Sequence, residues 1–171
     1  GGGAAPGGGV RVGGRSGGRG VPVAWGPAAM SKRARDMAIS LRFAEASPEM
    51  TALKAALAAK SYDVFLCDEA AGVDLMRTIT SAFCHCQLVI VAATKTYGKQ
   101  TTSGFSTYEE MNFFVTSKTP YFLIKMTETP GDRWEEDATN FNFSTAVWEY
   151  WKPGTPMPAG LPDRIIAKYL A

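Results

Sequence analysis

The stretch Gln87–Val115, QLVIVAATKTYGKQTTSGFSTYEEMNFFV, decides the fold that this sequence predicts. It opens with Leu88–Val91, an apolar and mostly β-branched run that is typical of a strand buried on both faces of a parallel sheet. A polar loop from Thr94 to Gly104 follows, longer than the usual strand-to-helix connection of about 2–6 residues. Ser106 then provides an N-cap for a helix. The stretch therefore predicts one strand–loop–helix unit of an α/β protein.

Two adjacent carboxylates, Glu109 and Glu110, fall in the first turn of this predicted helix, where negative charge suits the helix dipole. In open α/β sheets, ligands bind beyond the carboxyl ends of the strands. Glu109 is therefore expected where a reacting carboxylate would stand, or else it only complements the dipole. Glu110, about 100° further around the helix, is the alternative in the other register.

The remaining chain alternates strand-like and helix-like segments. Predicted strands cover residues 37–43, 63–67, 88–91, 120–126 and 146–151, and predicted helices cover 47–60, 73–83, a segment from 106, and 163–170. Ser47 is expected to cap the first helix, and Pro48 to occupy its first helical position. Residues 127–143 are acidic and aperiodic, which predicts a loop. Successive βα units indicate a flavodoxin-like, three-layer α/β fold with a five-stranded, mostly parallel sheet and helices on both faces.

Composition divides the chain into two parts. Residues 1–29 are low-complexity Gly, Ala and Pro with scattered Arg, which favours disorder, although an Arg-rich and acid-free leader also weakly resembles an organelle transit peptide. We predict a disordered leader over 1–35 and one folded domain over 36–171. Of the 18 Lys and Arg, six lie in residues 1–35, which leaves 12 basic against 16 acidic residues for the domain. This balance argues against nucleic acid as a partner.

Several other classes of protein are disfavoured. No apolar run approaches the roughly 18 residues that a membrane span needs. Three cysteines do not form a disulfide framework, so a cytoplasmic location is expected. Cys84-His85-Cys86, even with Cys67, lacks the ligand spacings of a zinc site, and we predict no metal. Neither a G-x-G-x-x-G fingerprint nor a P-loop follows a predicted strand, so no resident cofactor is expected.

Five short motifs, in the correct order, resemble those of Toll/interleukin receptor (TIR) domains over about residues 36 to 170. Ile39–Arg42 (ISLR) resembles the first-strand box, which usually reads F-I-S-Y followed by a basic residue. Val64–Gly72 (VFLCDEAAG) is similar to the second strand and BB loop, and Gln87–Val91 looks like the third strand. Phe105–Glu109 (FSTYE) is similar to the W-C-x-x-E helix start, with Phe for Trp and Ser for Cys. Tyr150-Trp151 echoes the late F-W box.

The resemblance implies functional residues. Some TIR domains cleave NAD at the nicotinamide–ribose bond with the glutamate of the third-helix motif, which corresponds to Glu109. Ser40 and Arg42 then lie near the nucleotide. Tyr97 and Phe105 are candidates to stack on the adenine or nicotinamide ring, although such rings more often pack in a core.

Other TIR domains are assembly modules, and this implies a second function. Their BB loop corresponds here to a segment that contains Asp68, Glu69 and Gly72. The sequence therefore predicts a TIR-like domain that hydrolyses NAD as its substrate, associates with itself or other TIR domains in signalling, or does both. A non-catalytic scaffold module is the alternative, and a relative that acts on another N-glycoside is a third.

Overall fold

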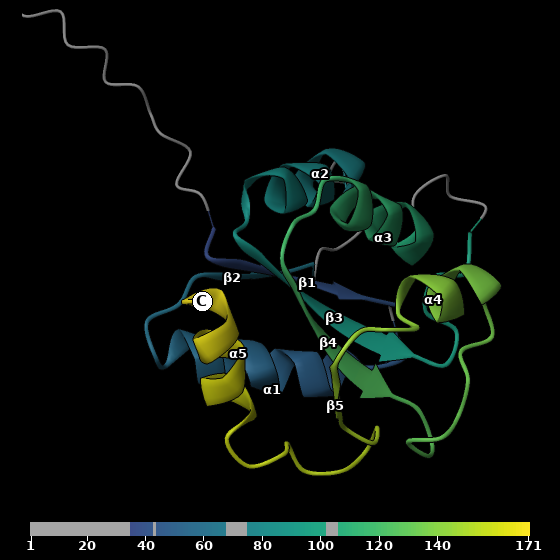
Figure 1. Cartoon of the computed structure of the whole chain (residues 1–171). Coiled ribbons are helices and arrows are strands. Elements are labelled where there is room, and N and C mark those ends of the chain that lie inside the picture. The colour runs from purple at the N-terminus through teal and green to yellow at the C-terminus, as the bar shows by residue number, and fades with distance from the viewer. Residues whose placement is uncertain (1–34, 43, 68–74, 102–105) are drawn as a thin grey trace, which may run out of the picture. The chain divides into compact units, whose positions relative to one another are not determined.

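A parallel β-sheet with strand order β2-β1-β3-β4-β5 forms the centre of the domain (Figure 1). The structure is a computed structural model that describes residues 35–42, 44–67, 75–101 and 106–171. Within these residues the strands are β1 Met37–Leu41, β2 Val64–Leu66, β3 Leu88–Thr94, β4 Tyr121–Met126 and β5 Trp148–Tyr150. All four neighbouring pairs are parallel, so the predicted flavodoxin-like α/β fold is confirmed.

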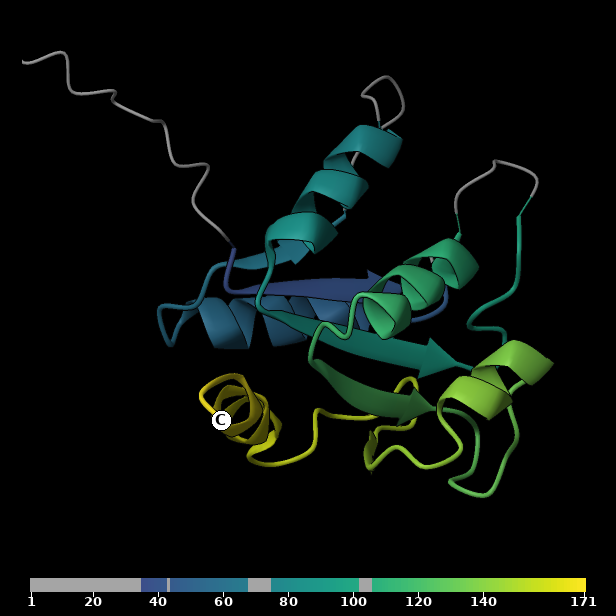
Figure 2. The same ribbon diagram turned by 45° about the horizontal axis from the view of Figure 1, so that its top comes forward.

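Helices cover both faces of this sheet. The described helices are α1 Ser47–Ala58, α2 Leu75–His85, α3 Thr107–Thr116, α4 Asp137–Asn142 and α5 Leu161–Tyr169. Figure 2 shows α1 and α5 on one side of the sheet, with α2 and α3 on the other. The two hydrophobic cores follow the same division, and the three-layer prediction is confirmed.

Strand alternation decides which side chain of β1 faces which helix layer. Met37, Ile39 and Leu41 belong to the core beneath α1 and α5, whereas Ala38 belongs to the core beneath α2 and α3. Successive side chains of a strand point to opposite faces, so Ser40 shares the face of Ala38. A buried hydroxyl is thereby placed against the α3 layer, at the carboxyl end of β1.

The strand order also creates a topological switch point. From β1 the chain crosses to β2 on one side, and it then returns to add β3 on the other side of β1. In open α/β sheets of this order, ligands bind in the crevice outside the carboxyl ends of the strands at this point. The residues that follow β1 and β3 therefore lie at the edge of the sheet where ligands bind in folds of this order.

Two predictions about local structure are wrong. The segment predicted as a loop over residues 127–143 contains α4, a helix of 6 residues. Such a helix is too short to show periodicity in the sequence, and it is held by tertiary packing of Thr139 and Phe143, which are 0% and 2% exposed. Ser47 does not cap α1 but is its first helical residue, since Ala46 occupies the cap position without a side-chain hydrogen bond.

Other boundaries shift by a few residues. Helix α5 begins at Leu161, earlier than predicted, with Pro162 in its first turn, where a missing N–H does little harm. The start predicted for α2 and the predicted leader fall largely outside the described residues; within them, Arg35 pairs with Asp63 at 3.3 Å. No helix in the described part of the chain is both long enough and apolar enough to cross a bilayer.

Candidate functional site

Three buried polar side chains meet at the switch point. Ser40 Oγ donates a hydrogen bond to Glu110 Oε2 at 2.5 Å, and the Ser40 and Tyr97 hydroxyl oxygens lie 2.6 Å apart. Ser40, Tyr97 and Glu110 are 1%, 0% and 8% exposed. This chain of hydrogen bonds joins β1, the turn after β3 and the first turn of α3.

Each member is positioned by its own element. Ser40 points to the α3 layer because of strand alternation. Tyr97 is held in a turn in which its N–H donates to the Thr94 carbonyl, and its ring packs against Phe143 at a centroid distance of 6.2 Å. Glu110 follows the start of α3, and the helix aims its carboxyl group at β1.

The burial of this network controls its protonation. Burial raises the pKa of Glu110 from 4.5 to about 8; the hydrogen bond from Ser40 lowers it in part, and the nearby charge of Glu109 raises it. Burial, together with the charge of Glu110, also raises the pKa of Tyr97 well above its usual value. Tyr97 therefore stays protonated and donates to Ser40 Oγ, while Ser40 donates to Glu110.

Glu109, the predicted catalytic residue, has a different set of contacts. Its Oε2 accepts from the Ser106 backbone N–H at 2.7 Å and from the Ser106 hydroxyl, while the Ser106 side chain accepts from Tyr108 N–H at 3.3 Å. This reciprocal pair is a capping box at the start of α3. The structure thus brings Glu110, the register alternative, to Ser40, and leaves Glu109 at the helix cap.

Ser47 and Ser106 are both predicted helix caps, but only Ser106 caps a helix in the structure, and this difference can be tested. Ser106→Ala is expected to destabilise the domain by about 1 kcal/mol, within a range of roughly 0.5–2, because it removes the cap of α3. Ser47→Ala is expected to change stability by less than about 0.5 kcal/mol, since Ser47 caps nothing. Urea unfolding of both variants measures the two values, and equal losses would contradict the assignment.

Arg42 lies at the same edge of the sheet but is already paired. Its Nε is 3.1 Å from Glu45 Oε1, and its guanidinium donates to the Lys99 carbonyl at 3.4 Å. Thr96 Oγ1 also donates to Glu45 Oε1, at 2.5 Å. Glu45 and Thr96 therefore belong to this edge, although neither follows from the sequence motifs.

The remaining predicted site residues divide into two groups. The Tyr97 ring is fully buried and packs in the core, which is the alternative to stacking on a substrate ring. Its hydroxyl group forms the hydrogen bond with Ser40. Phe105 and the predicted interaction loop, with Asp68, Glu69 and Gly72, lie outside the described residues.

The three cysteines differ in burial. Cys67 is buried, Cys84 is exposed and Cys86 is partly buried, and burial raises the pKa of the Cys86 thiol to about 11. Within the described ranges, no group of three or more His, Cys, Asp or Glu side chains is arranged to hold a metal ion.

Neither a protein-family model nor a curated protein matches this sequence. The resemblance to TIR domains therefore rests on the five sequence motifs alone.

Proposed function

We propose that this chain is a TIR-like domain that hydrolyses NAD at the nicotinamide–ribose bond, with Glu110 as the reacting carboxylate. The observation that carries the proposal is the buried Glu110 carboxyl group, hydrogen-bonded to Ser40 at the switch point of the sheet. Strongly perturbed and buried carboxyl groups are enriched at functional sites. Glu109 is a weaker candidate because its carboxylate is used by the cap of α3.

The chemistry needs one well-placed carboxylate. When the glycosidic bond breaks, its electron pair goes to the ring nitrogen of nicotinamide, which leaves as a neutral base and needs no acid. The ribose carbon becomes part of an oxocarbenium ion, and water adds to this carbon and releases a proton. A carboxylate beside the developing positive charge stabilises the transition state.

The protonation state of Glu110 couples to the charge of the substrate. With a pKa of about 8, Glu110 is mostly protonated at neutral pH in the ligand-free protein. The positively charged nicotinamide ring favours the ionised form, so binding releases a proton. Ser40 donates to the resulting carboxylate and orients it. In this proposal Arg42, which pairs with Glu45 in the ligand-free protein, binds a phosphate of the nucleotide instead.

Nicotinamide release from NAD tests the proposal, with the full chain at concentrations high enough for assembly. Glu110→Gln is expected to lower the rate about 100-fold or more, since it keeps the shape and removes the negative charge. The matched variant Glu109→Gln, one residue away, is expected to stay within about fivefold of wild type once folding is confirmed. kcat/KM of the wild-type protein is expected to rise with pH up to about 8.

Two results would contradict this assignment. Equal turnover by wild type and Glu110→Gln would show that Glu110 takes no part in the reaction. Loss of turnover in Glu109→Gln alone would make Glu109 the reacting carboxylate. No release from a folded, concentrated chain would instead favour the non-catalytic interaction module.

A further inference from the structure

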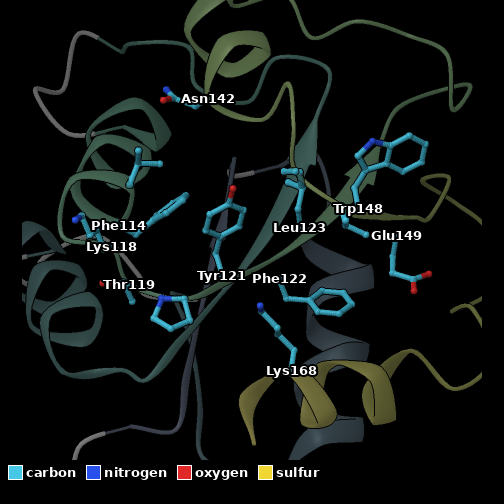
Figure 3. Close-up of a pocket in the computed structure, with 14 residues that line it drawn as sticks. Phe114, Lys118, Thr119, Tyr121, Phe122, Leu123, Asn142, Trp148, Glu149 and Lys168 are labelled. Carbon is cyan, nitrogen blue, oxygen red and sulfur yellow. The ribbon is translucent and has the colours of Figure 1, made fainter. Parts of the chain in front are cut away.

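A groove of about 550 Å³ lies at the opposite end of the sheet from the candidate site, at the start of β4 (Figure 3). Tyr121, Phe122 and Leu123 form part of its lining from β4, together with residues from the end of α3, the segment around Trp148, and Lys168 on α5. The volume is within the range of about 300–1,000 Å³ that ligand sites occupy. This surface is separate from the Ser40–Glu110 network.

The sheet edge is open inside this groove. In the described sheet, β5 pairs with β4 only from Leu123 to Lys125. Val89 N–H donates to the Pro120 carbonyl on one side of β4, and Trp151 N–H donates to the Lys125 carbonyl on the other. Because backbone groups alternate along a strand, the N–H and C=O of Tyr121 point to the β5 side, before β5 begins. One ladder position is thus open to another extended chain.

Apolar side chains line this open position. Tyr121 and Phe122 are half-buried, on opposite faces of β4. Trp148 is 38% exposed, and its ring is held by the Lys125 ammonium group 5.0 Å from the ring centroid. Val147, immediately before β5, is 94% exposed. An extended segment in this position would contact apolar side chains of the groove, among them Tyr121, Phe122 and Trp148.

The charge of the groove is positive. Its charged lining residues are Lys118, Glu149 and Lys168. Glu149 is neutralised by Arg164, with 2.7 Å between Oε1 and Nε. The two lysines are exposed, and neither forms a salt bridge with a described residue. Figure 3 shows Lys168 extending from α5 towards the start of β4, with Lys118 beyond Tyr121 at the end of α3.

We infer that this groove binds an extended, acidic peptide segment of a partner protein. The peptide backbone continues the line of β5 and pairs with Tyr121, as in strand addition to a sheet edge. Its apolar side chains contact Phe122 and Trp148, and its carboxylates lie near Lys118 and Lys168. The inference is independent of the proposed NAD hydrolysis. The opposing reading is that a short edge strand flanked by lysines prevents pairing, which predicts no peptide binding.

Fluorescence anisotropy tests the inference with the full chain and a fluorescein-labelled peptide, acetyl-Glu-Glu-Val-Phe-Val-Glu-Glu-amide. A second peptide replaces every Glu with Gln, and a third replaces both Val with Pro, which removes backbone donors but keeps the charge. Each is expected to bind about tenfold more weakly than the acidic peptide at about 50 mM salt. The combined variant Lys118→Gln/Lys168→Gln is expected to lose the same factor, whereas Lys95→Gln, an exposed lysine outside the groove, is expected to bind normally.

Contrary outcomes are equally clear, provided that thermal unfolding shows the variants to be folded. Equal binding of the acidic and proline peptides would show that the peptide does not pair with the sheet edge. Binding unaffected by the lysine changes would show that the peptide does not bind in this groove. No binding at about 1 mM peptide would support edge protection instead. Sedimentation at rising protein concentration adds one further outcome: self-association that disappears in the double-lysine variant would make a second copy the occupant and overturn the peptide assignment.

Discussion

Replacing Glu110 by glutamine is expected to stabilise the folded domain by roughly 3–5 kcal/mol at pH 9, and to change its stability by less than about 1 kcal/mol at pH 5. Glutamine has the shape of the protonated carboxyl group and accepts the same hydrogen bond from Ser40. It cannot ionise, so it removes the unfavourable free energy of a buried negative charge.

The direction in which stability changes with pH follows from the protons bound by Glu110. The unfolded chain releases the Glu110 proton near pH 4.5, whereas the folded protein keeps it until about pH 8. Between these values the folded state binds more protons, so raising the pH favours the unfolded state. The penalty is absent below pH 4.5, grows across this interval and is complete above pH 8. The wild-type protein therefore loses stability with rising pH where the variant does not.

Urea unfolding of both proteins at several pH values between about 5 and 9 measures this divergence, and the difference between them isolates the substituted group. Glu109→Gln is the matched control. It is expected to change stability by less than about 1 kcal/mol across this pH range, because glutamine keeps a side-chain oxygen that accepts the hydrogen bonds of the α3 capping box. Parallel pH profiles for wild type and Glu110→Gln would show that folding does not raise the pKa of Glu110.

The same substitution links stability to function. A carboxyl group that destabilises its own fold at high pH is what a trade-off between stability and activity predicts, if Glu110 has the role proposed above. Glu110→Gln is then expected to produce a more stable and less active protein. A variant that is less stable as well as inactive would indicate a structural role.

The sequence was sufficient for the sheet but not for every helix. The continuous apolar run at Leu88–Val91 predicts a doubly buried strand, and all 7 residues of β3 are buried. Ser106 predicts the start of α3 because its cap is a local interaction. Helix α4 has no such local signal, since buried contacts of Thr139 with the turn after β3 hold it in place.

The sequence leaves Glu109 and Glu110 as alternative carboxylates, and the structure gives them different contacts. Position along the chain cannot separate Glu109 from Glu110, but the S-x-x-E pattern of a capping box assigns Glu109 to the cap, and strand alternation points Ser40 towards α3. Those two local rules together would have favoured Glu110. The contact of Ser40 with Tyr97, 57 residues further along the chain, depends on tertiary structure and has no local signal.

Gly98, next to Tyr97, is the position where one added methyl group is expected to do most damage. Gly98→Ala is expected to destabilise the domain by about 3 kcal/mol or more. Its φ of 85° is unfavourable for a residue with a side chain. An added Cβ would also lie 2.1 Å from Thr139 Oγ1, a buried hydroxyl that donates to the Tyr97 carbonyl at 2.7 Å.

The clash and the backbone strain can be separated by a second substitution. Thr139→Ala removes the clashing oxygen, so the double variant Gly98→Ala/Thr139→Ala is expected to be less destabilised than the sum of the single variants. Gly131→Ala is the control, because its added Cβ meets nothing within 4 Å, and it is expected to be nearly neutral. Denaturant unfolding of the four variants measures their free energies of unfolding and tests both expectations. A Gly98→Ala variant as stable as Gly131→Ala would mean that the turn carrying Tyr97 is not packed against α4, and the placement of the Tyr97 hydroxyl beside Ser40 would lose its support.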